Sequence, residues 1–266
     1  MNFRYLFGAL LSIPLLLIMY VQGKRIRASV PPLPEADFPV GSTKADVVDA
    51  IRIITIGEST IAGVGAKTHE EAFTGTLAQC LTDQTAKAVH WRVYAKSGYT
   101  VKKMRERLVP KIEEKQLDLI VIGTGGNDAF SLNSPTQWRK EQAKLIEDLR
   151  SKFPDTPICF TNMPPIHEFP AFTSIIQFVV GNLVQLLGEE LADLVQPYDK
   201  VYFNSEQISF DTWTKRYNMS GDIEEFFSDG VHPAVITYQV WAKDFVNFLM
   251  QQPKLKENLF SDTTVS

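Results

Sequence analysis

The feature that most constrains the fold is a regular alternation, from residue 47 onward, of short apolar segments with segments of helical periodicity. Five apolar segments have the length and composition of buried strands, and they cover residues 51–56, 89–95, 117–123, 157–162 and 200–204. Between them, apolar residues recur every three or four positions, which is typical of helices with one buried face. Strands that alternate with helices predict a parallel sheet covered by helices on both faces.

Local signals place the helices between these strands. Thr68-x-x-Glu71 is a capping-box pattern, and Ser134-Pro135 is an N-cap followed by a first-turn proline, so each predicts the start of a helix. Periodicity alone marks further helices over residues 101–112, 172–195 and 234–250.

The N-terminus has a different character, because residues 5–22 contain no charged side chain. A helix of that length spans about 27 Å, close to the hydrocarbon thickness of a bilayer. We expect residues 1–27 to be an uncleaved membrane anchor, and a cleaved signal peptide is the alternative. The basic residues Lys24, Arg25 and Arg27 after this segment favour a cytoplasmic domain, whereas an export signal would place it outside. The side of the membrane therefore stays open.

The rest of the chain is expected to form one domain over residues 47–252. A chain of 266 residues, 44% of them hydrophobic, suffices for one α/β core. A proline-rich linker is expected over residues 28–46, and a polar C-terminal tail over residues 253–266. The net charge of −4 argues against nucleic acid as a partner. Cys80 and Cys159 lack the spacing of a metal site, so we expect buried thiols.

Gly57-Glu58-Ser59 directly follows the first predicted strand and opens a glycine-rich turn. The turn fails three motifs that it superficially matches. A phosphate-binding loop would need lysine at position 66, a dinucleotide fingerprint would need glycine at position 68, and a hydrolase elbow would need glycine at position 61. Taken alone, the serine would be read as a helix cap.

Other polar residues follow the later strands. Gly98 follows the second strand, Asn127 the third, and Asp229 and His232 precede the last helix. In a parallel sheet these positions meet at the carboxyl edge, where ligands bind. A serine becomes nucleophilic when a histidine accepts its proton, and a carboxylate three residues before that histidine can orient the ring. The combination predicts a serine-nucleophile site.

Four blocks in this order resemble the SGNH hydrolases, also called the GDSL esterase/lipase family. The blocks are Gly57-Glu58-Ser59, Gly98, Gly125-Gly126-Asn127-Asp128 and Asp229-Gly230-Val231-His232-Pro233. The resemblance covers residues 51–250. It implies a three-layer α/β/α fold around a flavodoxin-like, five-stranded parallel sheet. Glu58 departs from the family, which usually has aspartate before the serine.

The same resemblance implies the roles of the site residues. Ser59, His232 and Asp229 would form a catalytic triad. The backbone N–H groups of Ser59 and Gly98 and the side-chain amide of Asn127 would form an oxyanion hole. Neither a metal ion nor an organic cofactor is implied.

The expected activity is hydrolysis of carboxylic esters or thioesters through an acyl-enzyme. The expected partners are a small-molecule or lipid ester as substrate and a membrane bound through the N-terminal helix. An acyltransferase or deacetylase acting on a lipid or glycan, or a catalytically silent module that binds acylated ligands, is the alternative. The apolar stretch 171–195 has two interpretations. It is either a crossover helix in the core, or a segment whose N-terminal half borders the acyl pocket or faces the bilayer near the anchor, and the two differ at Phe172, Ile176 and Phe178. His167 is a further candidate for a substrate contact.

Overall fold

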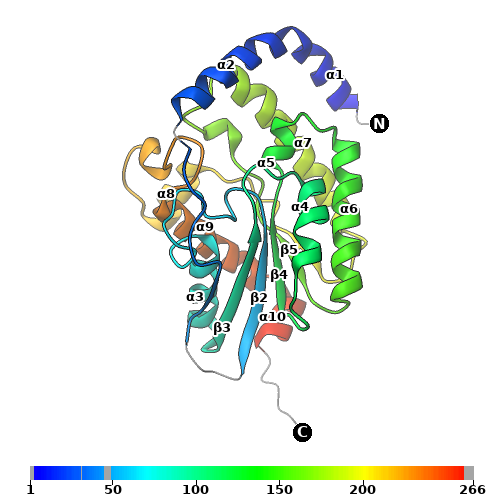
Figure 1. The fold of residues 1–266 in the computed structure, drawn as a ribbon, viewed down its shortest axis with the longest axis vertical. Helices are drawn as coiled ribbons and strands as arrows, with labels where there is room; N and C mark the ends of the chain where they lie inside the picture. Colours follow the sequence, from blue (N-terminus) through cyan, green and yellow to red (C-terminus); the bar gives the residue numbers. More distant parts are fainter. Residues whose placement is uncertain (1–2, 31, 45–48, 261–266) are drawn as a thin grey trace.

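A six-stranded sheet lies between two layers of helices in the computed structural model, which describes residues 3–30, 32–44 and 49–260 (Figure 1). The strands are β1 (Val40–Ser42), β2 (Ala50–Gly57), β3 (Ala88–Ala95), β4 (Leu119–Gly123), β5 (Ile158–Phe160) and β6 (Val201–Phe203). Their order is β1-β3-β2-β4-β5-β6, and β2 to β6 run parallel. The predicted flavodoxin-like sheet is confirmed, and its strand order reverses between β2 and β4.

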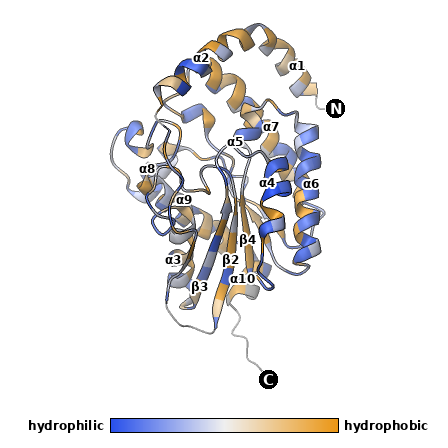
Figure 2. Cartoon of the chain, in the orientation of Figure 1, coloured by the Kyte–Doolittle hydropathy of each residue, from blue (hydrophilic) through white to orange (hydrophobic). Residues whose placement is uncertain are grey.

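Helices cover both faces of this sheet. On one side lie α3 (Phe73–Thr85) and α9 (Val235–Met250), and on the other lie α4 (Val101–Arg107), α6 (Pro135–Lys152) and α7 (Ser174–Val195) (Figure 1). Two further helices are α5 (Gly126–Phe130) and α8 (Phe210–Tyr217). Strands β2 and β4 are almost wholly buried and hydrophobic (Figure 2), as expected for strands covered on both faces.

The first core helix begins later than the capping-box pattern predicts. Residues 68–72 form a turn, and α3 begins at Phe73. The Glu71 carboxylate does reach back, accepting hydrogen bonds from the backbone N–H groups of Lys67 at 2.7 Å and Thr68 at 3.4 Å. Those bonds close a turn instead of a helix. The other start signal is confirmed, because Ser134 is the N-cap of α6 and its hydroxyl accepts a hydrogen bond from the Gln137 N–H.

The segment predicted as a linker is bound to the domain over residues 32–44. Strand β1 pairs antiparallel with β3, and the Ala36 N–H donates to the Ala62 carbonyl at 2.9 Å. The Glu35 carboxylate also accepts a hydrogen bond of 2.7 Å from the Ser97 N–H. Proline-rich chain is already extended, which suits it to pair with the open edge of a sheet. The predicted boundary at residue 47 lies outside the described residues.

The C-terminal segment is also more structured than a polar tail. Residues Pro253–Phe260 form α10, and its Leu255 and Leu259 side chains are buried against the domain. These leucines are four residues apart, so they share one helix face. Residues 261–266 of the predicted tail lie outside the described residues.

The N-terminal segment forms an arch over the carboxyl ends of the strands (Figure 1). It consists of α1 (Phe3–Ser12), a short 3₁₀ turn and α2 (Leu16–Ser29), and its colour in Figure 2 is largely hydrophobic. By length and composition two helices of the described chain are apolar enough to cross a membrane, Phe3–Ser29 and α7. Half of the most apolar window of α7 is buried inside the molecule, as in a core helix, whereas none of the N-terminal window is buried.

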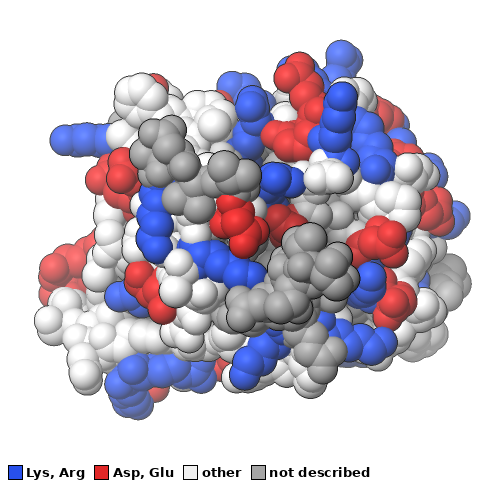
Figure 3. All heavy atoms as spheres, turned by 90° about the horizontal axis from the view of Figure 1, so that it is seen from below, with Lys and Arg blue, Asp and Glu red and all other residues white. Residues whose placement is uncertain are grey.

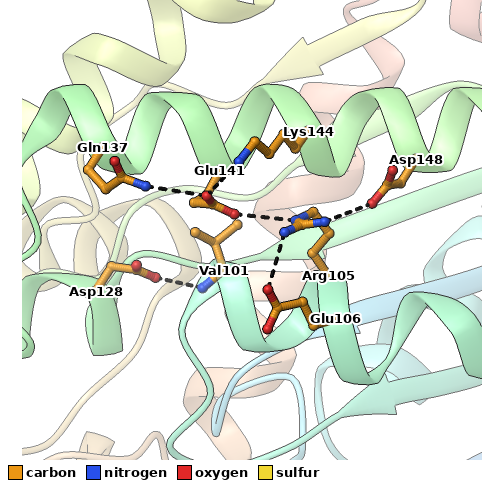
Figure 4. Close-up of polar contacts among 8 residues, drawn as sticks. All are labelled: Val101, Arg105, Glu106, Asp128, Gln137, Glu141, Lys144 and Asp148. Carbon is orange, nitrogen blue, oxygen red and sulfur yellow. Dashed lines mark hydrogen bonds and ion pairs between the residues drawn. The ribbon is translucent and has the colours of Figure 1, made fainter.

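Helix α4 is fixed to its neighbours by charged groups (Figure 4). The guanidinium of Arg105 lies 3.3 Å from the buried carboxylate of Glu141 and 3.4 Å from that of Asp148, both on α6. Asp128 of α5 accepts a hydrogen bond of 2.8 Å from the Val101 N–H at the start of α4. These contacts fix the loop that precedes α4, which carries Gly98.

The face at the opposite end of the sheet has charges of both signs. Lysine and arginine alternate there with aspartate and glutamate (Figure 3). Proteins that bind nucleic acid present a continuous basic patch. The described residues on this face do not form such a patch. Of the two cysteines, Cys159 is buried as predicted, whereas Cys80 is only half-buried.

A stability prediction follows from the turn after β2. Gly65 has φ +101°, and a Cβ there would lie 2.6 Å from the Pro233 carbonyl oxygen, which belongs to the loop before α9. Gly65→Ala should therefore lower the free energy of unfolding by about 1–3 kcal/mol, measured by urea denaturation. Gly8→Ala is the control, because a Cβ at Gly8 meets nothing within 4 Å. Equal stability of both variants would contradict the prediction.

Candidate active site

Ser59 is presented by a sharp turn at the end of β2. Gly57 pairs with Gly123 of β4, and the Ile61 side chain occupies the space that a Cβ on either glycine would need. The chain then turns back, with the Val64 N–H donating to the Ser59 carbonyl at 3.1 Å. Ser59 is half-buried, and within the described residues its hydroxyl makes no hydrogen bond. The hydroxyl is thus accessible at the strand end.

His232 and Asp229 form a tightly bonded pair on the loop before α9. Nδ1 of His232 lies 2.7 Å from Oδ2 of Asp229, whose side chain is only 1% exposed. Oδ1 of Asp229 accepts hydrogen bonds from the N–H groups of His232 at 2.7 Å and Val231 at 2.9 Å. Burial acts to raise the pKa of Asp229, but the His232 ring and these backbone bonds outweigh it, so the pKa lies below its usual value. Asp229 is therefore a carboxylate that orients the imidazole.

The histidine loop is attached directly to the serine turn. The buried Tyr238 hydroxyl, on α9 directly after the loop, donates to the Val64 carbonyl at 2.7 Å, and the exposed Ser228 hydroxyl, on the loop itself, lies 3.2 Å from the Gly65 carbonyl. Within the loop, the Ser228 N–H donates to the His232 carbonyl at 2.8 Å. These bonds hold the loop that carries His232 against the turn that starts at Ser59.

Hydrogen-bond donors gather from two further loops. The Gly98 residue has φ +78° and is exposed, and a Cβ there would meet nothing within 4 Å, so the backbone is open to a ligand. Among the described residues, the N–H groups of Ser59 and Gly98 have no hydrogen-bond acceptor. The Asn127 amide donates one hydrogen bond, to the Tyr99 carbonyl at 3.1 Å, which joins its turn to the Gly98 loop. An amide has a second N–H to offer.

Glu58, which replaces the aspartate usual in the family, positions the turn that carries Asn127. Its side chain is 6% exposed, and its two carboxylate oxygens accept hydrogen bonds of 2.8 Å each from the N–H groups of Gly126 and Asn127. Burial raises the pKa of Glu58 to about 7, while these two bonds act to lower it. The carboxylate thus joins the end of β2 to the first turn after β4.

Other residues considered from the sequence lie elsewhere. His167 is exposed, its ring covers Gly181, and it lines a separate cavity of about 360 Å³. His69 is buried in the turn before α3, and His90 lies near the start of β3, away from the carboxyl edge. In the described part of the chain, no three His, Cys, Asp or Glu side chains are arranged to hold a metal ion.

Comparison with known proteins decides the family. The model of the GDSL-like Lipase/Acylhydrolase family matches residues 55–240, which is more than half of the chain. The chain belongs to the GDSL-like lipase/acylhydrolase family. The region matched contains the Ser59 turn, the Gly98 and Asn127 loops and the Asp229–His232 pair. The resemblance to the SGNH/GDSL hydrolases is therefore confirmed.

Solved structures share the fold of this GDSL-like protein. A putative GDSL-like lipase from Parabacteroides merdae matches with a TM-score of 0.60 at 20% identity, over 80% of this chain and 100% of that one. A lipase/acylhydrolase from Enterococcus faecalis matches with a TM-score of 0.53 at 19% identity, over 75% and 95%. A phospholipase A1 from Streptomyces albidoflavus matches with a TM-score of 0.52 at 14% identity, over 75% and 99%. No curated protein sequence matches this chain.

Family membership makes this GDSL-like protein an ester-hydrolysing enzyme. The five site residues predicted from the sequence lie at or against the carboxyl edge: Ser59, Gly98, Asp229 and His232 on loops, and Asn127 in the first turn of α5. The contacts that position these segments were not predicted. The position of Glu58 directly before Ser59 could have indicated a role in the site. The sequence around Asp128 and Tyr238, by contrast, does not indicate that either side chain binds a residue far along the chain.

The raised pKa of Glu58 predicts a pH-dependent stability. Between pH 4.5, which is the ordinary pKa of glutamate, and about pH 7, Glu58 keeps its proton in the folded state but has released it in the unfolded chain. The stabilisation from Glu58 is thus fully present below pH 4.5 and is lost as the pH rises toward 7, a change of about 3 kcal/mol. Urea denaturation of the wild type and of Glu58→Gln at pH 5 and pH 8 measures it.

Glutamine stays neutral at both pH values, so the wild type should lose its advantage over the variant between pH 5 and pH 8. Glutamine also leaves one backbone N–H without an acceptor, which costs about 1–3 kcal/mol at either pH and cancels in the comparison. Parallel pH profiles of the two proteins would show that Glu58 titrates at its ordinary pKa.

Proposed function

We propose that this enzyme hydrolyses carboxylic esters or thioesters with Ser59 as nucleophile, His232 as general base and Asp229 as the residue that orients the histidine. The observation that supports this most strongly is the 2.7 Å bond between Asp229 and Nδ1 of His232, on a loop attached to the serine turn. This bond fixes the ring, so Nε2 is the atom left to accept a proton.

The proposed reaction proceeds through an acyl-enzyme. Oγ of Ser59 attacks the carbonyl carbon of the ester while Nε2 of His232 takes the hydroxyl proton. The tetrahedral oxyanion accepts hydrogen bonds from the N–H groups of Ser59 and Gly98 and from the amide of Asn127. The C–O bond of the ester then breaks, and the alcohol leaves with the proton held by His232. Water, deprotonated by His232, attacks the acyl-serine, releases the carboxylic acid and restores Ser59.

We also propose that residues 3–29 associate with a lipid bilayer. Large apolar side chains of this segment are exposed, including Phe3, Phe7, Leu10, Leu11, Ile13 and Leu17. Lys24, Arg25 and Arg27 follow at its C-terminal end, where they match lipid headgroups. One structural neighbour is a phospholipase A1, and this agrees with a lipid ester as substrate.

The nucleophile is tested by covalent labelling with a fluorophosphonate probe, which reacts with activated serines. Ser59→Ala should abolish both labelling and p-nitrophenyl acetate hydrolysis, while the melting temperature stays close to that of the wild type because the half-buried hydroxyl has no bond to lose. Thr60→Ala, one residue further along the same turn, is the control and should keep labelling. Labelling that persists in Ser59→Ala would identify another nucleophile.

The oxyanion role of Asn127 predicts a selective loss of turnover. Asn127→Ala removes one donor and should lower kcat by roughly 10²–10³-fold with little change in KM. Steady-state kinetics at saturating ester, with a thermal melt to verify folding, measures the split. A rise in KM at unchanged kcat would mean that Asn127 binds the ground state instead.

A further inference from the structure

A cavity of about 910 Å³ lies between the N-terminal helix and the carboxyl edge of the sheet. Helix α2 contributes Met19, Tyr20 and Gly23 to its lining, and the body of the domain contributes Phe130, Phe172 and Ile176. His232 and Asp229 are also part of the lining. The volume is near the upper end of the range of roughly 300–1,000 Å³ that is typical of ligand pockets.

The N-terminal helix is held in this place by specific contacts. Oε1 of Gln22 accepts a hydrogen bond of 2.7 Å from the Thr173 hydroxyl at the start of α7. At the other end of the helix, Arg4 forms a 2.7 Å ion pair with Glu189 of α7. The chain that follows α2 is bound in turn by the bond from the Ser97 N–H to Glu35. The α2 wall of the cavity is therefore attached to the domain through Gln22, and the segments before and after α2 are attached as well.

We propose that this cavity binds the acyl chain of the ester and that the N-terminal helix is one wall of the substrate site, an inference that rests on the proposed function. The lining is apolar apart from a few groups, which include His232 and Asp229, so an aliphatic chain fits the apolar part while its carbonyl lies near His232. The lining residues of α2 extend from Leu16 to Arg27, a length of about 16 Å along the helix. That length suits a medium or long acyl chain rather than acetyl.

The positions of Phe172, Ile176 and Phe178 bear on this assignment. Phe172 lines the cavity and contacts Phe130 edge to face, with ring centroids 5.1 Å apart. Ile176 also lines the cavity, whereas Phe178 is 64% exposed and is not part of the lining. Of the three residues predicted to border an acyl pocket, Phe172 and Ile176 are therefore suitably placed, and Phe178 is not.

Gly23 offers a direct test, because it lines the cavity and a Cβ there would meet nothing within 4 Å. The Cβ of a larger side chain is therefore accommodated at this position, and the rest of that side chain occupies space at the cavity wall. Gly8 is the matched control: it belongs to the same N-terminal segment, a Cβ there also meets nothing within 4 Å, and it is not part of the lining.

The experiment measures kcat/KM of the full chain in detergent micelles for p-nitrophenyl acetate and p-nitrophenyl laurate. Gly23→Trp should lower the laurate-to-acetate ratio at least about tenfold, since the indole excludes several methylenes. Gly8→Trp should keep the wild-type ratio. Matching melting temperatures of the two variants would show that both fold. An unchanged ratio in Gly23→Trp would overturn the proposal, even if both esters are hydrolysed.

A binding measurement separates this inference from the proposed function. In the Ser59→Ala background, which removes turnover, the fluorescent probe 11-(dansylamino)undecanoic acid should bind, and Gly23→Trp should raise its Kd at least about tenfold. If the wild type hydrolyses no ester, binding that depends on Gly23 would still support the cavity while disproving the esterase mechanism. Binding that is indifferent to Gly23, or absent, would overturn the acyl-chain site.

Discussion

The parallel pairing of β2 with β4 is the constraint on which the rest of the structure depends. Gly57 lies opposite Gly123 at the end of both strands, and the strand order reverses at this point. The chains leaving the two strands consequently separate toward opposite faces of the sheet, which opens a crevice at the carboxyl edge. The turn that carries Ser59 follows β2, and helix α5, which carries Asn127, follows β4.

Buried polar contacts then give the crevice a defined shape. The Glu58 carboxylate connects the serine turn to the Asn127 turn, and Asp128 connects the latter to the start of α4. The buried Tyr238 hydroxyl attaches α9, which directly follows the histidine loop, to the serine turn. A buried group without its partner would cost free energy, so each of these bonds restricts the loops to one arrangement. A catalytic constellation requires such restriction, because its atoms react only at short, defined distances.

The N-terminal helix links the site to its surroundings. Residues of α2 line the cavity beside His232, and the N-terminal segment also exposes apolar residues such as Phe7, Leu10 and Leu17. An apolar segment of this kind can meet two apolar environments. Here those are the proposed acyl chain and the proposed bilayer, so an ester leaving the membrane would pass along a single hydrophobic element to reach the serine.

The sequence by itself determined the alternation of strands and helices, the carboxyl-edge positions of Ser59, Gly98 and Asn127, and the pairing of Asp229 with His232. Each of these depends on local periodicity or on short spacing, which a linear pattern records. Only the tertiary structure decided that residues 40–42 add an edge strand, that α10 docks through Leu255, and that α2 covers a cavity. The partners of Glu58 and Tyr238 belong to the same class, since they lie 68 and 174 residues away along the chain. Contacts over such separations arise from packing and topology, and neither leaves a periodic trace in the sequence.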